Sequence, residues 1–331
     1  MSQLRIAVVT NMYPSPAEPG FGTFVHDQVE ALRRAGTQVD VFFFNGRAST
    51  WNYVWAFFRL WAFLWRRRYD LLHAHFVLAG IVARAQWGHK VVLTHHGVEL
   101  LGYPRWQTWL ARLVTPLVDE AIYVSAELRE ALHDRDGWVI PCGIDLDVFT
   151  PVERAEARAR LGLPSDRRLV LWAGESWREE KRFYLVEQAM ARVKLALPDA
   201  DLVLLSNRPH DVVPLYMSAC DALVLTSAAE GSPMVIKEAM ACNLPIVSVR
   251  VGDVPEVVGD TPGCALAEHD PLDIADKLVH VLREPRRTTG REHIGHLRHD
   301  RIAQRLLEVY EHTLRSARVR RAEPVARRSE P

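Results

Sequence analysis

The stretch DALVLTSAAEGSPMVIKEAMACNLPIVSV at residues 221–249 contains a complete strand–helix–strand unit. Its first apolar run predicts a buried strand, residues 233–242 a helix, and residues 244–249 a second strand. Ser232 and Pro233 fit the N-cap and the first helical position, because serine accepts from a first-turn amide and proline lacks only a donor that would be unpaired there. Two strands joined by a helix predict a parallel α/β sheet.

The same alternation extends in both directions along the chain and predicts an α/β protein of two doubly wound, Rossmann-like domains, 1–145 and 146–298. Residues 299–315 predict a final helix with one apolar stripe, which we expect to pack back on the N-terminal domain. The apolar-poor, Arg-rich segment 316–331 predicts a disordered basic tail. Further strands are expected at 4–10, 39–44, 168–174 and 201–206, and short strands are expected within the stretches 70–76, 90–97, 119–132 and 138–145.

Composition narrows the class of protein. The 331 residues carry 41 Lys and Arg against 41 Asp and Glu, so a broad nucleic-acid-binding surface is not expected. The four cysteines form no CxxC pair and follow no secretory leader, which favours a reducing cytoplasm. A chain of this length buries a sufficient core without disulfides.

The loop before the 233–242 helix is the clearest candidate site. Ligands of open α/β sheets bind beyond the carboxyl ends of the strands, and unpaired amides at a helix N-terminus attract phosphate. Glu230 and Glu238 bracket this loop, and carboxylates suit the hydroxyls of a sugar. The spacing therefore suggests a nucleotide sugar. The alternative is that Glu230 is an acid near a helix start and Glu238 a solvated helical residue.

At this point the sequence resembles a known family. Glu230 and Glu238, separated by seven residues and followed by AMA at 239–241 and Pro245, resemble the EX7E signature of retaining GT-B glycosyltransferases of family 4, the glycosyl transferases group 1. The resemblance continues to about Tyr310. It implies two Rossmann-like domains facing across a cleft. Other stretches that agree are the 14–22 loop, THHG at 94–97, VIPCGIDLDVF at 139–149 and VGDVPEVVGD at 251–260.

The resemblance also implies roles for individual residues. Glu230 would bind hydroxyls of the donor sugar and Glu238 the ribose of the nucleotide, while Gly231, Ser232 and Pro233 would cradle the donor. The implied reaction moves a sugar from a nucleotide-diphosphate sugar, UDP favoured and GDP possible, to an acceptor hydroxyl with retention of configuration. No metal or other cofactor is expected, and a hexosyl or N-acetylhexosaminyl group fits the family.

Positive charge for the leaving diphosphate is implied at Lys181. The family's accompanying arginine directly after the glycine is replaced here by Glu175, so we assign its role to Arg178. One histidine of THHG would contact the transferring sugar, and His96 is expected rather than His95 because it lies closer to the end of the strand.

Gly20 and Gly22 precede the first helix, and the resemblance places their loop beside the donor. A plain strand-to-helix turn is the alternative. The third glycine of a dinucleotide fingerprint is missing, which disfavours an NAD-dependent oxidoreductase. His73 and His75 alternate on one strand and would point the same way, but without a partner at ligand spacing they favour packing over a metal site.

Two departures from the family pattern affect the expected structure. Cys142 stands where asparagine is common. Only 14 residues separate the strands at 201–206 and 221–227, where the family usually has a further strand and helix, so the C-terminal sheet should be one strand shorter.

The segment 51–68, WNYVWAFFRLWAFLWRRR, combines four tryptophans and four arginines with no acid. It is too short and interrupted to span a bilayer and fits a helix lying on an anionic membrane, with the Arg-rich tail as a second contact. A buried helix of the N-terminal domain is the alternative. Membrane contact would suit a lipid-linked or saccharide acceptor of the cell envelope and a peripheral position on the inner face of the cell membrane.

Other functions remain compatible with the same donor loops. A GT-B nucleotide-sugar epimerase or hydrolase would use them without an acceptor, and a non-catalytic module would bind the nucleotide sugar only. The intact Glu230, Lys181 and Glu238 favour an enzyme.

Overall fold

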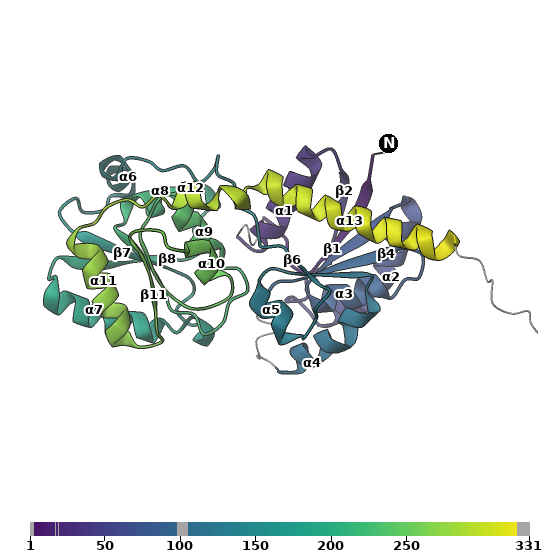
Figure 1. The fold of residues 1–331 in the computed structure, drawn as a ribbon, viewed down its shortest axis with the longest axis horizontal. Coiled ribbons are helices and arrows are strands. Elements are labelled where there is room, and N and C mark those ends of the chain that lie inside the picture. Colours follow the sequence, from purple (N-terminus) through teal and green to yellow (C-terminus); the bar gives the residue numbers. More distant parts are fainter. Residues whose placement is uncertain (1–2, 17, 19, 98–104, 323–331) are drawn as a thin grey trace, which may run out of the picture.

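The structure, a computed structural model, describes residues 3–16, 18, 20–97 and 105–322, of which 105 and 317–322 are described by their backbone alone. Two parallel sheets with helices on their faces lie side by side along the long axis of the molecule (Figure 1). This is the predicted arrangement of two Rossmann-like α/β domains, and the fold class is confirmed.

The N-terminal sheet has the strand order β2-β1-β3-β4-β5-β6, and all its neighbouring strands are parallel. The order reverses beside β1, so the carboxyl ends of β1, β3 and β4 open a crevice there. The strands are β1 (Arg5–Thr10), β2 (Gln38–Phe43), β3 (Leu71–His75), β4 (Lys90–His95), β5 (Glu120–Tyr123) and β6 (Trp138–Val139).

Helices cover both faces of this sheet because successive side chains of its strands point to opposite sides. In β1, Ile6 and Val8 belong to one buried cluster, and Ala7 and Val9 belong to the other. Helices α1 and α13 cover the first face, while α3 and α4 lie on the second (Figure 1). The helices inserted between the strands are α1 (Thr23–Arg34), α2 (Trp51–Arg66), α3 (Val77–Arg84), α4 (Arg105–Val114) and α5 (Ala126–Ala131).

The C-terminal sheet has the order β11-β10-β9-β7-β8. Between β8 and β9 the chain, described throughout, forms only a 3-10 turn (His210–Val212) and α8, so the expected shortening of this sheet is confirmed. The strands are β7 (Arg168–Ala173), β8 (Ala200–Leu205), β9 (Ala222–Leu225), β10 (Ile246–Val249) and β11 (Cys264–Ala267). The helices are α6 (Arg154–Leu161), α7 (Phe183–Ala196), α8 (Val213–Ala219), α9 (Met234–Ala241), α10 (Val254–Val258), α11 (Pro271–Arg283) and α12 (Gly290–His293).

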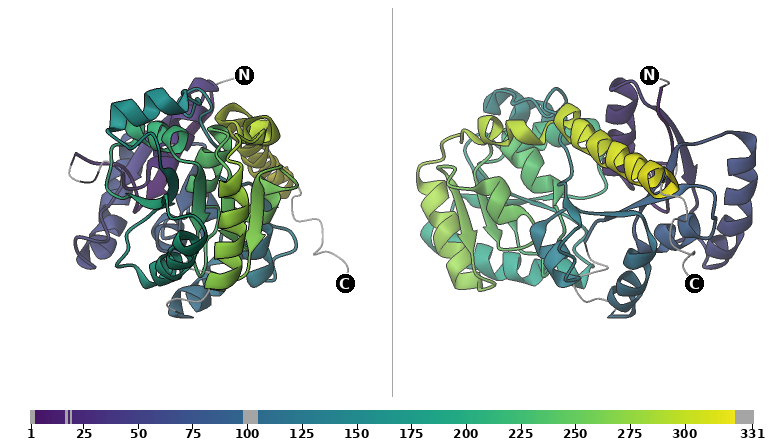
Figure 2. Two further views of the ribbon diagram at one scale, coloured as in Figure 1. Left: turned by 90° about the vertical axis from the view of Figure 1, so that its left-hand side faces the viewer. Right: turned by 45° about the vertical axis from the view of Figure 1, so that its right-hand side comes forward.

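The last helix, α13 (His299–Ala322), leaves the C-terminal domain and runs along α1 over the N-terminal sheet (Figures 1 and 2). The buried Tyr310 hydroxyl lies 2.7 Å from Nδ1 of His73 on β3 and fastens the helix to the sheet. The prediction that the helix ends at 315 and disorder begins at 316 is wrong for 316–322, which continue the helix. Ala and Arg are good helix formers even where no apolar stripe remains. Residues 323–331 lie outside the described residues.

Candidate active site

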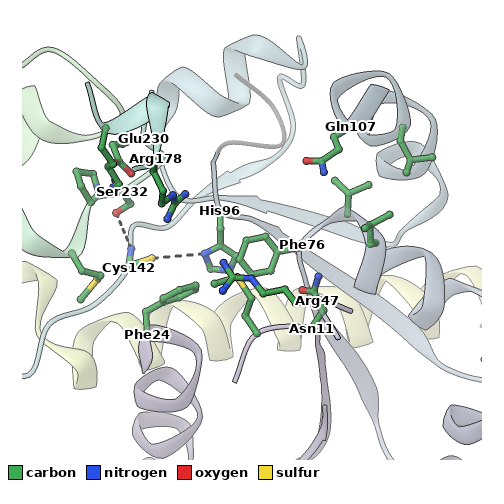
Figure 3. Close-up of a pocket in the computed structure, with 18 of the residues that line it drawn as sticks. Asn11, Phe24, Arg47, Phe76, His96, Gln107, Cys142, Arg178, Glu230 and Ser232 are labelled. Carbon is green, nitrogen blue, oxygen red and sulfur yellow. Dashed lines mark hydrogen bonds and ion pairs between the residues drawn. The ribbon is translucent and has the colours of Figure 1, made fainter. Parts of the chain in front are cut away.

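A cavity of about 520 Å³ lies between the two domains, at the carboxyl ends of their strands (Figure 3). Its walls come from both sheets, as expected for ligand sites of open α/β folds. The N-terminal domain contributes Asn11, Met12, Phe24, Arg47, Tyr53, Phe76, Val77, Leu78, His96, Gln107, Leu110 and Cys142. The C-terminal domain contributes Arg178, Lys181, Glu230, Gly231, Ser232, Pro233 and Met234.

Lys181 and Glu230 form an ion pair in the C-terminal wall, with Nζ 2.5 Å from Oε1. Two distant loops have to meet for this contact. The hydroxyl of Thr226, just after β9, donates to the Lys181 carbonyl at 2.9 Å, and the Ala228 amide donates to the Glu180 carbonyl at 2.7 Å. The two charged residues predicted at separate positions in the sequence therefore occupy one site.

Arg178 also lines the cavity, close to the Glu230 loop (Figure 3). Its guanidinium is paired with Glu180 at 2.5 Å and lies 4.0 Å from Glu175. The arginine is thus held by neighbouring carboxylates while it borders the space where an anion would bind.

Ser232 lines the cavity but does not cap α9, so that prediction is wrong. The N-cap position is Pro233, and no side chain caps the helix. The Ser232 hydroxyl instead donates to Asp253 at 2.6 Å and accepts from the buried ammonium of Lys237 and, at 3.4 Å, from the amide of Cys142. A buried ammonium needs several acceptors, and this need overrides the local preference of serine for an N-cap.

His96 lies on the N-terminal wall between Phe24 and Phe76, opposite Glu230 and Arg178 (Figure 3). Its Nε2 is 2.8 Å from Nδ1 of His75, and its Nδ1 is 3.9 Å from Sγ of Cys142. Burial, together with the neighbouring histidines, lowers the pKa of His96 well below its usual value. The imidazole facing the cavity is therefore neutral at pH 7.

His95 is placed differently, which agrees with the choice of His96 as the cavity histidine. Its ring stacks on Tyr123, and its Nε2 lies 3.0 Å from the Thr115 hydroxyl. His73 is equally structural, because its two ring nitrogens contact Tyr310 and Thr94. Among the described residues, no group of three or more His, Cys, Asp or Glu side chains could hold a metal ion.

Three predicted donor residues lie outside this cavity. Glu238, on α9, faces His210 at 3.8 Å. Gly20 has open space around it. Gly22 has φ 77° and would place a Cβ 2.6 Å from the Met12 carbonyl carbon, so only glycine lets the loop close onto Met12, which lines the cavity. The structure thus gives Gly22 a role in shaping the wall.

Several polar lining residues were missed by the sequence reasoning. Asn11 follows β1 directly, and the strand-end rule would have indicated it. Arg47 follows β2 and lies over the Phe21 ring at 4.1 Å. Gln107 comes from α4 and faces the cavity from the far side of the N-terminal wall (Figure 3). No local pattern indicates Arg47 or Gln107, because the contact that brings each one to the cavity is tertiary.

Comparisons with known proteins agree with this geometry. Two family models match, Glycosyltransferase Family 4 over residues 19–148 and Glycosyl transferases group 1 over residues 170–284. The D-inositol 3-phosphate glycosyltransferase of Mycolicibacterium smegmatis is 31% identical over 315 residues, which are 79% of this chain and 71% of that protein. The chain therefore belongs to the GT-B glycosyltransferases of family 4. It is a glycosyltransferase.

Other similar proteins extend the comparison. The putative teichuronic acid biosynthesis glycosyltransferase TuaC of Bacillus subtilis is 27% identical over 349 residues, covering 85% of this chain and 88% of that protein. A sucrose-phosphate synthase structure from Thermosynechococcus elongatus superposes with a TM-score of 0.82 at 22% identity, covering 95% of this chain and all of that chain. HepE of Anabaena, solved with UDP and glucose, has a TM-score of 0.71 at 16% identity, covering 94% of this chain and all of that chain. At these identities, the two structural matches show the shared fold.

Proposed function

We propose that the protein is a retaining glycosyltransferase that moves a hexosyl or N-acetylhexosaminyl group from a nucleotide-diphosphate sugar, with UDP favoured, to an acceptor hydroxyl. The observation that carries the proposal is the meeting of Lys181, Glu230 and the 231–233 backbone in one cavity, opposite His96. HepE of Anabaena, which shares the fold, was solved with UDP-glucose, and this supports the choice of donor.

In this proposal the C-terminal wall binds the donor. Lys181 and Arg178 stabilise the charge that grows on the departing diphosphate, and the amides at the start of α9 add their dipoles. Lys181 exchanges its partner Glu230 for the diphosphate, which frees the Glu230 carboxylate to accept hydrogen bonds from sugar hydroxyls. Glu238, outside the cavity, would reach the ribose from α9.

The neutral His96 imidazole can hydrogen-bond the transferring sugar without repelling an oxocarbenium-like transition state. The acceptor hydroxyl attacks the anomeric carbon on the face from which the diphosphate leaves. The bond between the anomeric carbon and the diphosphate oxygen breaks as the new glycosidic bond forms. The leaving phosphate oxygen takes the proton of the acceptor hydroxyl. Lys181 and Arg178 supply the positive charge, so the proposal needs no metal.

The acceptor belongs, in this proposal, to an envelope polysaccharide or glycolipid, and the enzyme works at the cytoplasmic face of the cell membrane. TuaC, one of the similar proteins, is described as a teichuronic acid biosynthesis glycosyltransferase. Residues 51–66 form α2, which leaves Trp51, Trp55 and Trp65 exposed. No described helix is long and apolar enough to cross a bilayer, so surface contact through α2 is the mode proposed.

The test measures donor binding by thermal shift across a panel of nucleotide sugars and then transfer of radiolabelled sugar. Glu230→Gln and Lys181→Ala are each expected to lower turnover at least about 100-fold, since the first weakens the hydrogen-bond acceptor for the sugar hydroxyls and the second removes positive charge from the leaving diphosphate. Lys194→Ala is the control, because this lysine is exposed on α7, pairs with Asp201 and does not line the cavity. Near-normal turnover by both variants would refute the assignment. Release of free sugar without a glycosylated product would favour a hydrolase.

A further inference from the structure

Exposed tryptophans are concentrated on one part of the molecule. Seven of the ten tryptophans of the chain are exposed on α2, just after α3, or on α4. Trp65 at the end of α2 is 93% exposed, and Trp87 after α3 is 86% exposed. The seven are Trp51, Trp55, Trp61, Trp65, Trp87, Trp106 and Trp109. Leu113 and Leu117 add exposed apolar surface at the end of α4. Large exposed apolar surface of this kind is typical of a binding face.

These side chains share one layer of helices. The connections β2-α2-β3, β3-α3-β4 and β4-α4-β5 all run in the same direction across the sheet, so right-handed crossovers place the three helices on the same face. Helix α3 packs between α2 and α4. Helices α1 and α13 cover the opposite face (Figures 1 and 2).

The charge of this layer identifies its partner. Neither α2 nor α4 contains an Asp or Glu, whereas Arg59, Arg66 and Arg112 lie on them and Arg68 follows α2. Tryptophan rings prefer the boundary between lipid headgroups and acyl chains, and arginine is drawn to anionic headgroups. The combination of many tryptophans with arginine and without acid fits the surface of an anionic bilayer.

The inner side of the same helices forms the acceptor half of the cavity. Tyr53, two residues from both Trp51 and Trp55 and therefore on the opposite side of α2, lines it, and so does Gln107, between Trp106 and Trp109 on α4. The start of α3 contributes Val77 and Leu78, and α4 also contributes Leu110. The helices that carry the exposed aromatic face thus reach the reaction space with neighbouring residues.

We propose that α2, the end of α3 and α4 form one docking surface for an anionic bilayer, and that the acceptor is a lipid-anchored molecule whose headgroup enters the cavity lined by Tyr53 of α2 and Gln107 of α4. Its lipid stays in the membrane. The part concerning the acceptor rests on the proposed glycosyl transfer, while docking does not. The surface extends beyond the 51–68 segment to Trp87 and α4.

Docking is tested by flotation of the full chain with POPC/POPG vesicles and with POPC vesicles. The wild type is expected to float with the anionic vesicles only. Trp106→Ser/Trp109→Ser on α4 is expected to weaken binding at least about tenfold, as is Trp55→Ser/Trp61→Ser on α2. Leu195→Ser, an exposed leucine of α7 on the other domain, is the control and should bind like the wild type. Circular dichroism checks that each variant is folded.

Wild type that stays unbound with POPC/POPG vesicles would overturn the docking surface, and an α4 variant that floats like wild type would remove α4 from it. The route of the acceptor is tested with the donor that turns over, using vesicles made from a bacterial total lipid extract. Radiolabel is expected in organic-extractable product, and label confined to water-soluble product would overturn the lipid-anchored acceptor. Flotation needs no turnover, so loss of transfer alone contradicts the proposed function and leaves docking standing.

Discussion

Lys237 is a completely buried lysine whose partners come from both domains. Its ammonium donates to the Cys142 carbonyl at 2.8 Å and to the Ser232 hydroxyl, and it lies 3.0 Å from the Asp253 carboxylate. Residue 142 belongs to the segment that leaves the N-terminal sheet, whereas the other groups lie in the C-terminal domain. The network therefore ties the loop that carries Glu230 and Ser232 to the opposite domain.

Replacing this lysine should be costly because a buried carboxylate loses its counter-charge. We expect Lys237→Met to lower the free energy of unfolding by about 3–5 kcal/mol. The double variant Lys237→Met/Asp253→Leu should lose less than the sum of the two single variants, because it leaves no unpaired buried charge. Urea denaturation of the four proteins checks this, and strictly additive losses would contradict the coupling.

At the scale of elements, β3 and β4 bring three buried histidines, His73, His75 and His95, next to the half-buried His96 of the cavity wall. Burial lowers the pKa of His75 and of His95 to about 3, and it also lowers the pKa values of His73 and His96. These strands contribute neutral imidazoles, which hydrogen-bond to one another and to Tyr310, Thr94 and Thr115. The alternation of His73 and His75 serves packing and orientation of His96.

These lowered pKa values predict how stability depends on pH. Below about pH 6.5 the histidines bind protons in the unfolded chain but remain neutral in the folded protein. The free energy of unfolding therefore keeps their full contribution above that pH and falls as the pH decreases. Each histidine lowers the free energy of unfolding by at most about 1.4 kcal/mol for each pH unit of decrease. Midpoints of urea denaturation, measured from about pH 7.5 to about pH 5 in steps of about half a pH unit, check this. His95→Gln should reduce this dependence of stability on pH. His280→Gln is the control, because His280 is exposed on α11, and it should leave the dependence unchanged. An equal pH dependence in both variants would contradict the prediction.

At the scale of the whole molecule, Gly97 and Gly231 let the two domains approach each other, and Gly252 lets the loop after β10 pack on the Glu230 loop. A Cβ at Gly231 would lie 2.1 Å from the His96 carbonyl oxygen, and a Cβ at Gly97 would lie 2.8 Å from the Gly231 amide. A Cβ at Gly252 would lie 2.4 Å from the Gly231 oxygen, and the Gly252 amide donates to the Glu127 carboxylate at 2.7 Å. Backbone contacts at this distance place His96 opposite the Glu230 loop.

Gly231→Ala is therefore expected to hold the domains apart. Small-angle X-ray scattering should show a larger radius of gyration, and turnover should fall about 100-fold because the reacting groups are displaced by an ångström or more. Gly295→Ala is the matched control, since its Cβ would meet no atom within 4 Å. Unchanged scattering together with unchanged turnover would show that this approach is not needed.

The order of strands and helices was predictable because it depends on local periodicity and turn residues, which any stretch of about ten residues displays. The Glu230 loop was predictable as a strand-end segment for the same reason, whereas Lys181 was predicted from the resemblance to the family. The cap assigned to Ser232 and the end of the last helix at 315 were wrong. The Ser232 error follows from the buried charge of Lys237, which no short window reveals. The helix error follows from giving the missing apolar stripe more weight than the helix propensity of Ala and Arg at 316–322.

The sequence by itself determined two α/β domains, a strand-to-helix loop at 230–233 and an aromatic, basic segment at 51–68, because each is encoded within a few neighbouring residues. Only the tertiary structure decided that Lys181 meets Glu230, that His96 faces them, and that α4 joins α2 in one exposed layer. Those contacts join residues far apart in the chain, and their positions depend on how the sheets, crossover helices and domain interface pack together.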